Sequence, residues 1–380
     1  MKENDIKISK MVHRGLGLGH KNGRTYMIYN TLPDEVVDAE IIMTKKSYSI
    51  GRAIKIKERS PFRVEPVCKY YQICGGCQYM HAQYQFQIEL KQNVLYELLS
   101  RSLKRETIEI KRTPSILDLN YRLRAQFIVR GAKVGFTGFG SNDFVRIDEC
   151  KICHGKINEA VEILNRNIST VELNRLFVAT DGERIKTYPI KDFRENLEIM
   201  VNNLKYVIKP EIFFQANIYT LSELQRAVMP LEKGISAVDF YAGSGFFSLY
   251  MAKFFEYLLC IEEVSEASNL LKRNASINKI ENIEIINSSV ENAEIPKKYN
   301  SIDLLLLDPP RSGMSKRAIG RALNLNPKNI FYVSCDPATL ARDISYFHKN
   351  FYEISEIIMI DQFPHTFHFE TVVKMRRQYL

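Results

Sequence analysis

The last part of the chain, from about residue 210 to residue 380, alternates short apolar segments with amphipathic ones. Near-continuous apolar strands separated by helical segments are typical of a parallel sheet that is covered by helices on both faces. We therefore expect a doubly wound α/β domain over 210–380. The apolar segments that we interpret as its strands are 237–239, 258–261, 283–286, 303–308, 329–333, 354–360 and 370–374.

Residues 1–60 show a different pattern, in which short β-rich segments are separated by turn residues. Basic side chains alternate with tyrosines there, as in OB-like barrels that bind nucleic acids. A barrel whose lysines only contact water would show the same pattern. Between this module and the α/β domain, residues 61–209 predict a central α+β domain. Apolar residues at helical spacing predict a long helix over about 83–102, which we expect to pack on the C-terminal domain.

The chain is basic, with 53 Lys and Arg against 44 Asp and Glu and a formal net charge of +9. This charge favours a polyanionic partner, although lysine-rich codon usage would produce the same excess. No apolar segment reaches the roughly 18 residues that a membrane helix needs, and the first residues lack the apolar core of a secretory signal. We expect a cytoplasmic protein with no membrane partner.

Three cysteines are spaced C-x5-C-x2-C, at Cys68, Cys74 and Cys77. Thiols are kept reduced in the cytosol, so clustered cysteines there indicate metal binding or catalysis and not disulfides. The spacing differs from the paired C-x2-C knuckles of many zinc sites, and it favours an iron–sulfur site. A zinc site is the competing interpretation.

A glycine-rich segment, Phe240-Tyr-Ala-Gly-Ser-Gly245, follows an apolar strand and precedes a helical segment. Glycines at such a turn let the backbone approach a ligand closely. A dinucleotide loop would read G-x-G-x-x-G, which this segment does not. Glu262 ends the next strand, 23 positions after Asp239, where it would bind the ribose hydroxyls of S-adenosylmethionine. A glycine turn without a ligand is the competing interpretation.

Two further motifs end strands of the same sheet. Asp308 opens the sequence D-P-P-R after an apolar strand, where a carboxylate faces the ligand crevice. Cys335 follows another strand, and Asp336 and Pro337 predict that a helix begins directly after it. The positive end of a helix dipole lowers the pKa of a nearby thiol, so Cys335 is a candidate nucleophile. The alternatives are an Asp-Pro pair that only ends a strand and a small buried cysteine.

A carboxylate near the end of the chain completes the candidate site. Glu370 follows Asp361-Gln-Phe-Pro-His-Thr-Phe-His-Phe and begins the last apolar segment. A glutamate at a strand edge is often only solvated. In a crevice that also holds a thiolate and a methyl donor, however, it is a candidate general base.

These motifs resemble those of the RNA uracil-5-methyltransferase family, and in particular its iron–sulfur-containing 23S ribosomal RNA 5-methyluridine enzymes. The family patterns S-C-x-P-x-T-x-x-R-D, D-P-P-R-x-G and D-x-F-P-x-T-x-H-x-E are matched by residues 334–343, 308–313 and 361–370. The likeness covers nearly the whole chain. It implies an N-terminal TRAM barrel, a central iron–sulfur domain and a C-terminal Rossmann-like methyltransferase domain.

The resemblance also implies roles for individual residues. Cys335 is the implied nucleophile, and Glu370 is the implied proton-abstracting base. Cys150 is implied as the fourth ligand of a [4Fe-4S] cluster, with Cys153 as the alternative because the two form a C-x2-C pair. The residues implied to bind S-adenosylmethionine are Gln215, Tyr241, Glu262 and Asp308.

The implied function is methyl transfer to C5 of a uridine in 23S ribosomal RNA. Uracil C5 is a weak nucleophile, and addition of a thiolate to C6 turns it into an enolate carbon that can accept a methyl group. The target base must leave its stack for this addition. A T-loop uridine of transfer RNA is the alternative substrate, and a non-catalytic iron–sulfur RNA-binding protein is the alternative class. We expect RNA and not DNA as the partner, and a monomer; the motifs do not identify the target uridine.

Overall fold

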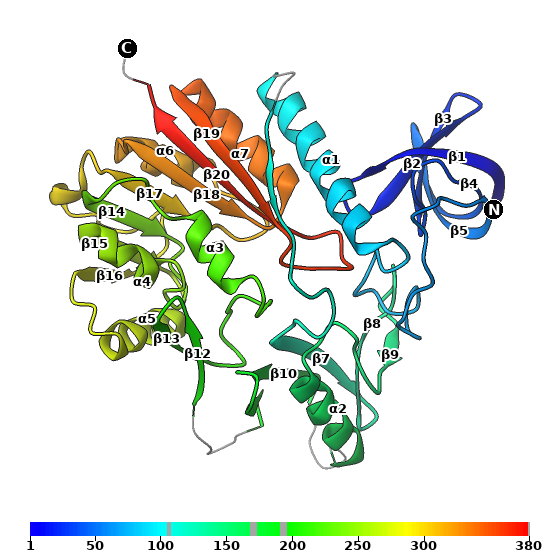
Figure 1. The fold of residues 1–380 in the computed structure, drawn as a ribbon, viewed down its shortest axis with the longest axis horizontal. Helices are drawn as coiled ribbons and strands as arrows, with labels where there is room; N and C mark the ends of the chain where they lie inside the picture. Colours follow the sequence, from blue (N-terminus) through cyan, green and yellow to red (C-terminus); the bar gives the residue numbers. More distant parts are fainter. Residues whose placement is uncertain (105–107, 168–172, 191–195, 379–380) are drawn as a thin grey trace.

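The computed structural model describes residues 1–104, 108–167, 173–190 and 196–378 (Figure 1). The strands in these residues form a closed barrel, a five-stranded sheet, a two-stranded hairpin and an eight-stranded sheet. No helix in the same residues is long and apolar enough to cross a membrane.

The N-terminal barrel has the strand order β1-β2-β3-β5-β4, and β4 closes it by pairing with β1. Its core is built from alternate residues of the strands, such as Ile6 and Ile8 on β1, because successive side chains of a strand point to opposite faces. The predicted N-terminal barrel is therefore confirmed. Its strands are β1 (Lys2–Val12), β2 (Leu16–Lys21), β3 (Arg24–Tyr29), β4 (Val36–Thr44) and β5 (Tyr48–Glu58).

The central sheet is antiparallel, with the order β11-β10-β7-β8-β9, and α2 (Gly155–Asn167) packs on it. Val161 of α2 shares a core with Phe127 and Val178 of the sheet. Cys153 is fully buried in that core, whereas Cys150 lies at its border. The strands are β7 (Arg124–Arg130), β8 (Lys133–Thr137), β9 (Phe144–Arg146), β10 (Arg175–Thr180) and β11 (Ile185–Tyr188).

The eight-stranded sheet has the order β16-β15-β14-β17-β18-β20-β19-β6. Strands β14 to β18 are mutually parallel, and β20 runs antiparallel between β18 and β19. The strand order reverses between β14 and β17, and such a switch point opens a ligand crevice at the carboxyl ends of the strands. The strands are β6 (Lys111–Thr113), β14 (Gly234–Phe240), β15 (Phe255–Glu262), β16 (Ile283–Asn287), β17 (Leu304–Leu307), β18 (Asn329–Ser334), β19 (Tyr352–Ile360) and β20 (Glu370–Arg377).

Both faces of this sheet are buried, which explains its near-continuous apolar strands. Leu305 and Leu307 of β17 face one core with α6 and α7, while Leu304 and Leu306 face the other core with α4 and α5. The predicted α/β class is confirmed. The helical segments are α3 (Leu221–Ala227), α4 (Ser248–Met251), η2 (Ala252–Phe254), α5 (Ser265–Ile277), η3 (Lys297–Tyr299), α6 (Lys316–Asn324) and α7 (Pro337–Lys349).

Segments outside 210–380 also belong to this α/β core. The helix expected over about 83–102 is α1 (Tyr84–Leu103), which lies between the barrel and the large sheet and buries Leu95 and Leu99 beside α7 (Figure 1). Strand β6 extends the sheet by pairing with β19. The hairpin of β12 (Leu197–Val201) and β13 (Leu204–Ile208) shares the core of α4 and α5. The packed core therefore does not follow the expected boundary at residue 210, because apolar faces from earlier segments are buried against it.

Candidate active site

The predicted functional residues lie side by side along the carboxyl edge of the parallel strands. Glu262 is the last residue of β15, and Tyr241 follows β14. Asp308 follows β17, and Cys335 follows β18. Because β15, β14, β17 and β18 are successive neighbours in the sheet, these four residues follow one another across its switch point.

Glu370 reaches the same edge because β20 runs in the opposite direction. A strand that is antiparallel to its neighbours begins where they end. Glu370 is the first residue of β20, and the next residue, Thr371, pairs with Ser334 at the end of β18. The carboxyl group therefore enters the crevice beside the loop that carries Cys335.

The loop of Cys335 is organised by the helix that follows it. Asp336 caps α7, because its side chain accepts the N–H groups of Ala338 at 3.0 Å and Thr339 at 2.9 Å. The predicted helix start is confirmed. The predicted low thiol pKa is wrong for the free protein. Burial, followed by the charge of Glu370, raises the pKa of Cys335 to about 12, and the charge of Arg311 opposes this only in part.

The two carboxyl groups of the crevice also hold their protons strongly. Burial raises the pKa of Asp308 to about 7. Burial and then the charge of Asp308 raise the pKa of Glu370 well above its usual value, while Arg311 acts in the opposite direction. The ionised form of a carboxyl group with a raised pKa is a stronger base than an ordinary carboxylate. This property suits a general base.

The glycine-rich turn is held by Glu262. One carboxylate oxygen accepts the N–H of Gly243 at 2.7 Å, and the other accepts the N–H of Val264 at 2.7 Å. Gly243 has a φ of +56°, a conformation that favours glycine, so the turn needs both this residue and its acidic partner. Gln215 lies farther from this turn in the sequence, and its amide oxygen accepts a 3.2 Å hydrogen bond from Gln362.

The five cysteines considered as metal ligands line one cavity of about 460 Å³ between the barrel and the central sheet. Burial, and then the charges of Cys150, Cys74 and Cys68, raise the pKa of Cys77 well above its usual value. These thiols therefore surround a shared space. Within the described ranges, no three or more His, Cys, Asp or Glu residues converge closely enough to hold a metal ion.

Cys150 and Cys153 differ in their environments. A hydrogen bond from Cys153 lowers the pKa of Cys150. The pKa of Cys153 is raised well above its usual value, first by its hydrogen bond to Cys150 and then by burial.

Two contacts in the site are not evident from the sequence. His13, in the turn between β1 and β2, places its Nε2 3.4 Å from Asp336 Oδ2, so the barrel touches the loop of Cys335. Asp343 is fully buried and accepts hydrogen bonds from Tyr332 at 2.6 Å and from the N–H of Met314 at 2.8 Å. It thereby joins α7 to the loop that follows Asp308. A lone histidine and a helical aspartate give no local signal of such long-range contacts.

The sequence of this chain is similar to a family model and to known RNA methyltransferases. A family model described as tRNA (Uracil-5-)-methyltransferase matches residues 159–378. An uncharacterised RNA methyltransferase of Clostridium acetobutylicum is 30% identical over 99% of this chain and 98% of its own. The 23S rRNA (uracil(1939)-C(5))-methyltransferase RlmD of Histophilus somni is 29% identical over 97% of this chain and 95% of its own.

A solved structure supports the same relationship over the whole chain. The crystal structure of Pyrococcus abyssi tRNA (uracil-54, C5)-methyltransferase, in complex with S-adenosyl-L-homocysteine, has a TM-score of 0.77 and 25% sequence identity. The match covers 99% of this chain and 100% of that chain.

The chain joins a β-barrel to an α/β domain with a glycine-rich turn at its switch point, and the relatives that match it over nearly its whole length are RNA methyltransferases. The family model matches more than half of the chain, and the chain belongs to the tRNA (uracil-5-)-methyltransferase family. This membership confirms the predicted enzyme class, an S-adenosylmethionine-dependent RNA uracil-5-methyltransferase.

Proposed function

We propose that the chain methylates C5 of a uridine through a covalent bond between Cys335 and C6 of the base. The observation that carries this proposal is the meeting of Cys335 and Glu370 at one edge of the sheet, next to Asp308. When bound there, S-adenosylmethionine supplies the methyl group. Glu262 and Tyr241 would hold its ribose and adenine side, and Gln215 and Asp308 its reacting end.

In the proposed reaction, the sulfur of Cys335 adds to C6 as a thiolate, and the electron pair of the C5–C6 bond moves to C5. C5 then takes the methyl group, and S-adenosylhomocysteine leaves. Glu370 accepts the proton from C5, the bond between Cys335 and C6 breaks, and 5-methyluridine is released with the thiolate restored. The addition and elimination replace one methylation step with a high barrier by two steps whose barriers are lower.

The covalent step can be tested with RNA in which the target uridine is 5-fluorouridine. Fluorine at C5 cannot be removed as a cation, so the elimination is blocked and the protein stays bonded to the RNA. We expect a stable adduct with the wild-type protein and S-adenosylmethionine, and none with Cys335→Ala. A Cys260→Ala variant is the matched control, because Cys260 is buried in β15 away from the crevice. An adduct that survives Cys335→Ala would overturn the mechanism.

For the substrate, we propose a uridine of 23S ribosomal RNA. The support is the RlmD relative, which matches over nearly its whole length. A T-loop uridine of transfer RNA is the second candidate, because the Pyrococcus abyssi structure is that of a transfer RNA enzyme. Mass spectrometry of both RNAs from a strain that lacks the gene decides between them. Loss of 5-methyluridine from 23S RNA is expected, and loss only from transfer RNA would reverse the choice.

We also propose that Cys68, Cys74, Cys77 and Cys150 hold a [4Fe-4S] cluster. The support is the cavity of about 460 Å³ that these cysteines line. The thiolates that bind a cluster surround the volume of the cluster, whereas the thiolates that bind a single metal ion converge on one atom. Cys150 is favoured over Cys153 as the fourth ligand by its position, because it packs in one cluster with Cys68 and Cys77, whereas Cys153 is fully buried in the core of the central sheet. Such a cluster would link the segment before α1 to the central sheet and would position RNA.

Iron and sulfide analysis of protein purified without oxygen tests the cluster. We expect four iron and four sulfide per chain in the proposed cluster. Cys150→Ser should lose iron, while Cys153→Ser should keep it. Stoichiometric zinc without sulfide would favour the competing metal site.

A further inference from the structure

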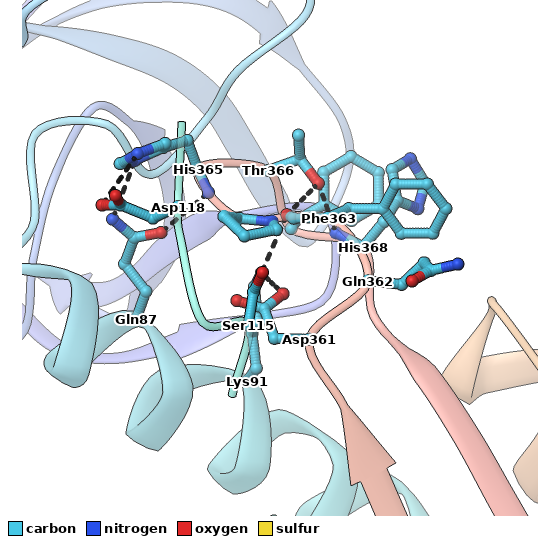
Figure 2. A network of polar contacts seen from close by, with 12 residues as sticks. Gln87, Lys91, Ser115, Asp118, Asp361, Gln362, Phe363, His365, Thr366 and His368 are labelled. Atoms are coloured by element: carbon cyan, nitrogen blue, oxygen red, sulfur yellow. Dashed lines mark hydrogen bonds and ion pairs between the residues drawn. The ribbon is translucent and has the colours of Figure 1, made fainter. Parts of the chain in front are cut away.

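One face of α1 contacts the loop that leads to Glu370. Gln87 and Lys91 are one helical turn apart, and their exposed fractions are 0% and 1%. Both side chains reach residues 361–369, which connect β19 to β20 (Figure 2). The two contacts join residues 270 and 278 positions apart in the sequence.

Lys91 binds the start of this loop. Its Nζ lies 2.7 Å from Asp361 Oδ1 and 3.1 Å from the carbonyl oxygen of Phe363 (Figure 2). The side chains of Lys91 and Asp361 are both fully buried, and burial lowers the pKa of Lys91 even though Asp361 acts against it. Apolar residues often replace a buried ion pair without loss of stability. A gain in the stability of the fold therefore does not explain this ion pair. The two contacts of Lys91 instead tie the loop to α1 in one conformation.

Gln87 binds the middle of the loop. Its Oε1 accepts the N–H of His365 at 2.9 Å, and its Nε2 lies 3.1 Å from His365 Nδ1. His365 has a φ of +65°, in the left-handed region, and Asp118 Oδ2 lies 3.2 Å from its Nε2. A residue keeps such a conformation only when its surroundings determine it from several sides.

The loop that these contacts hold leads directly to the proposed base. Asp361 directly follows β19, Glu370 is the first residue of β20, and Glu370 pairs with Ile360. We propose that Lys91 and Gln87 are positioning residues that aim the Glu370 carboxylate at the C5 proton. This inference rests on the proposed covalent mechanism and assigns a catalytic task to a helix outside residues 210–380.

The mechanism gives this role a specific signature. Cys335 and the methyl donor carry out thiol addition and methyl transfer, whereas Glu370 acts as a base only in the later proton removal. A Lys91→Met variant should therefore form the 5-fluorouridine adduct at a rate within about threefold of wild type, because neither step before elimination is altered. Its kcat on uridine RNA should fall at least about tenfold with unchanged KM values, since small misplacements of a catalytic group are costly. The covalent protein–RNA complex should also accumulate on ordinary uridine RNA.

Two companion variants keep the test decisive if Lys91→Met does not fold. Gln87→Leu removes the contacts to His365 without leaving a buried charge, and it should show the same signature. The double variant Lys91→Leu/Asp361→Leu removes both charges together, and it should fold yet remain slow in elimination. The matched control is Glu97→Gln on the same helix, which breaks the 2.8 Å ion pair to Lys10 of the barrel and should accumulate no complex.

Three results separate the possible failures. Wild-type kcat in the folded variants overturns the positioning role alone. Equal loss of adduct formation and turnover also overturns it, because a merely structural role would damage every step. Absence of the adduct in the wild-type protein overturns the covalent mechanism itself, and the positioning role with it.

Discussion

The thiol of Cys335 should be a poor nucleophile in the free protein. Burial and the charge of Glu370 raise its pKa from the ordinary 9.0 to about 12. The thiolate fraction at pH 8 is then roughly 10⁻⁴, against roughly 10⁻¹ for an ordinary thiol. Iodoacetamide reacts with the thiolate, and a thiolate of higher pKa is intrinsically more nucleophilic, which offsets part of this deficit. Cys335 should therefore be alkylated roughly 30- to 60-fold more slowly than an ordinary cysteine of equal accessibility.

The assay is mass spectrometry of the peptide that contains Cys335 after alkylation between pH 7 and pH 10.5. We expect the rate to rise about tenfold per pH unit with no plateau, because the thiol titrates only near pH 12. The shape of this profile does not depend on how easily the reagent enters the crevice. Glu370→Gln removes the second cause of the shift and should speed alkylation, whereas Glu353→Gln at the exposed far end of β19 should not. A plateau at or below pH 9 would refute the reasoning.

Three further predictions concern residues that hold the crevice together. Asp336→Ala should lower the free energy of unfolding by about 1 kcal/mol through loss of the cap of α7. Although burial acts to raise it, contacts with His13 and backbone N–H groups hold the pKa of Asp336 well below its usual value, so the loss should be full at pH 7 and shrink towards acid pH in urea titrations. Glu262→Gln should weaken S-adenosylmethionine binding about tenfold in calorimetry, while the exposed neighbour Glu263→Gln should not. Asp343→Asn should cost about 2 kcal/mol of stability in the same titrations, because buried donors lose a charged acceptor.

Much of the candidate site follows from strand order alone. Once the apolar segments are recognised as parallel strands, Glu262, Asp308 and Cys335 must share one edge, because each ends a strand. The position of Glu370 could not be derived in this way. It depends on β20 running antiparallel between β18 and β19, and an apolar segment shows neither its direction nor its neighbours.

The properties that depend on the folded environment were predicted less well. Capping of α7 is local, so Asp336 and Pro337 indicated it correctly. The thiol pKa of Cys335 depends on burial and on Glu370, 35 positions later in the sequence, and neither can be read from the local pattern that predicts the helix start. The contact of Lys91 with Asp361 likewise joins distant residues, and a lysine in an amphipathic helix gives no sign that it will be buried.

The docking of α1 beside α7 and of β6 against β19 has a consequence for synthesis on the ribosome. Lys91 emerges 270 residues before Asp361, which takes roughly 15 to 50 s at typical elongation rates. The part of α1 that packs on the large sheet, including Leu95 and Leu99, must remain without these partners for that time, whereas Leu90 and Val94 pack with Met11 of the barrel, which is synthesised earlier. A truncated chain that begins at residue 210 would lack both α1 and β6 and would leave β19 as an open strand edge, an arrangement that promotes self-association.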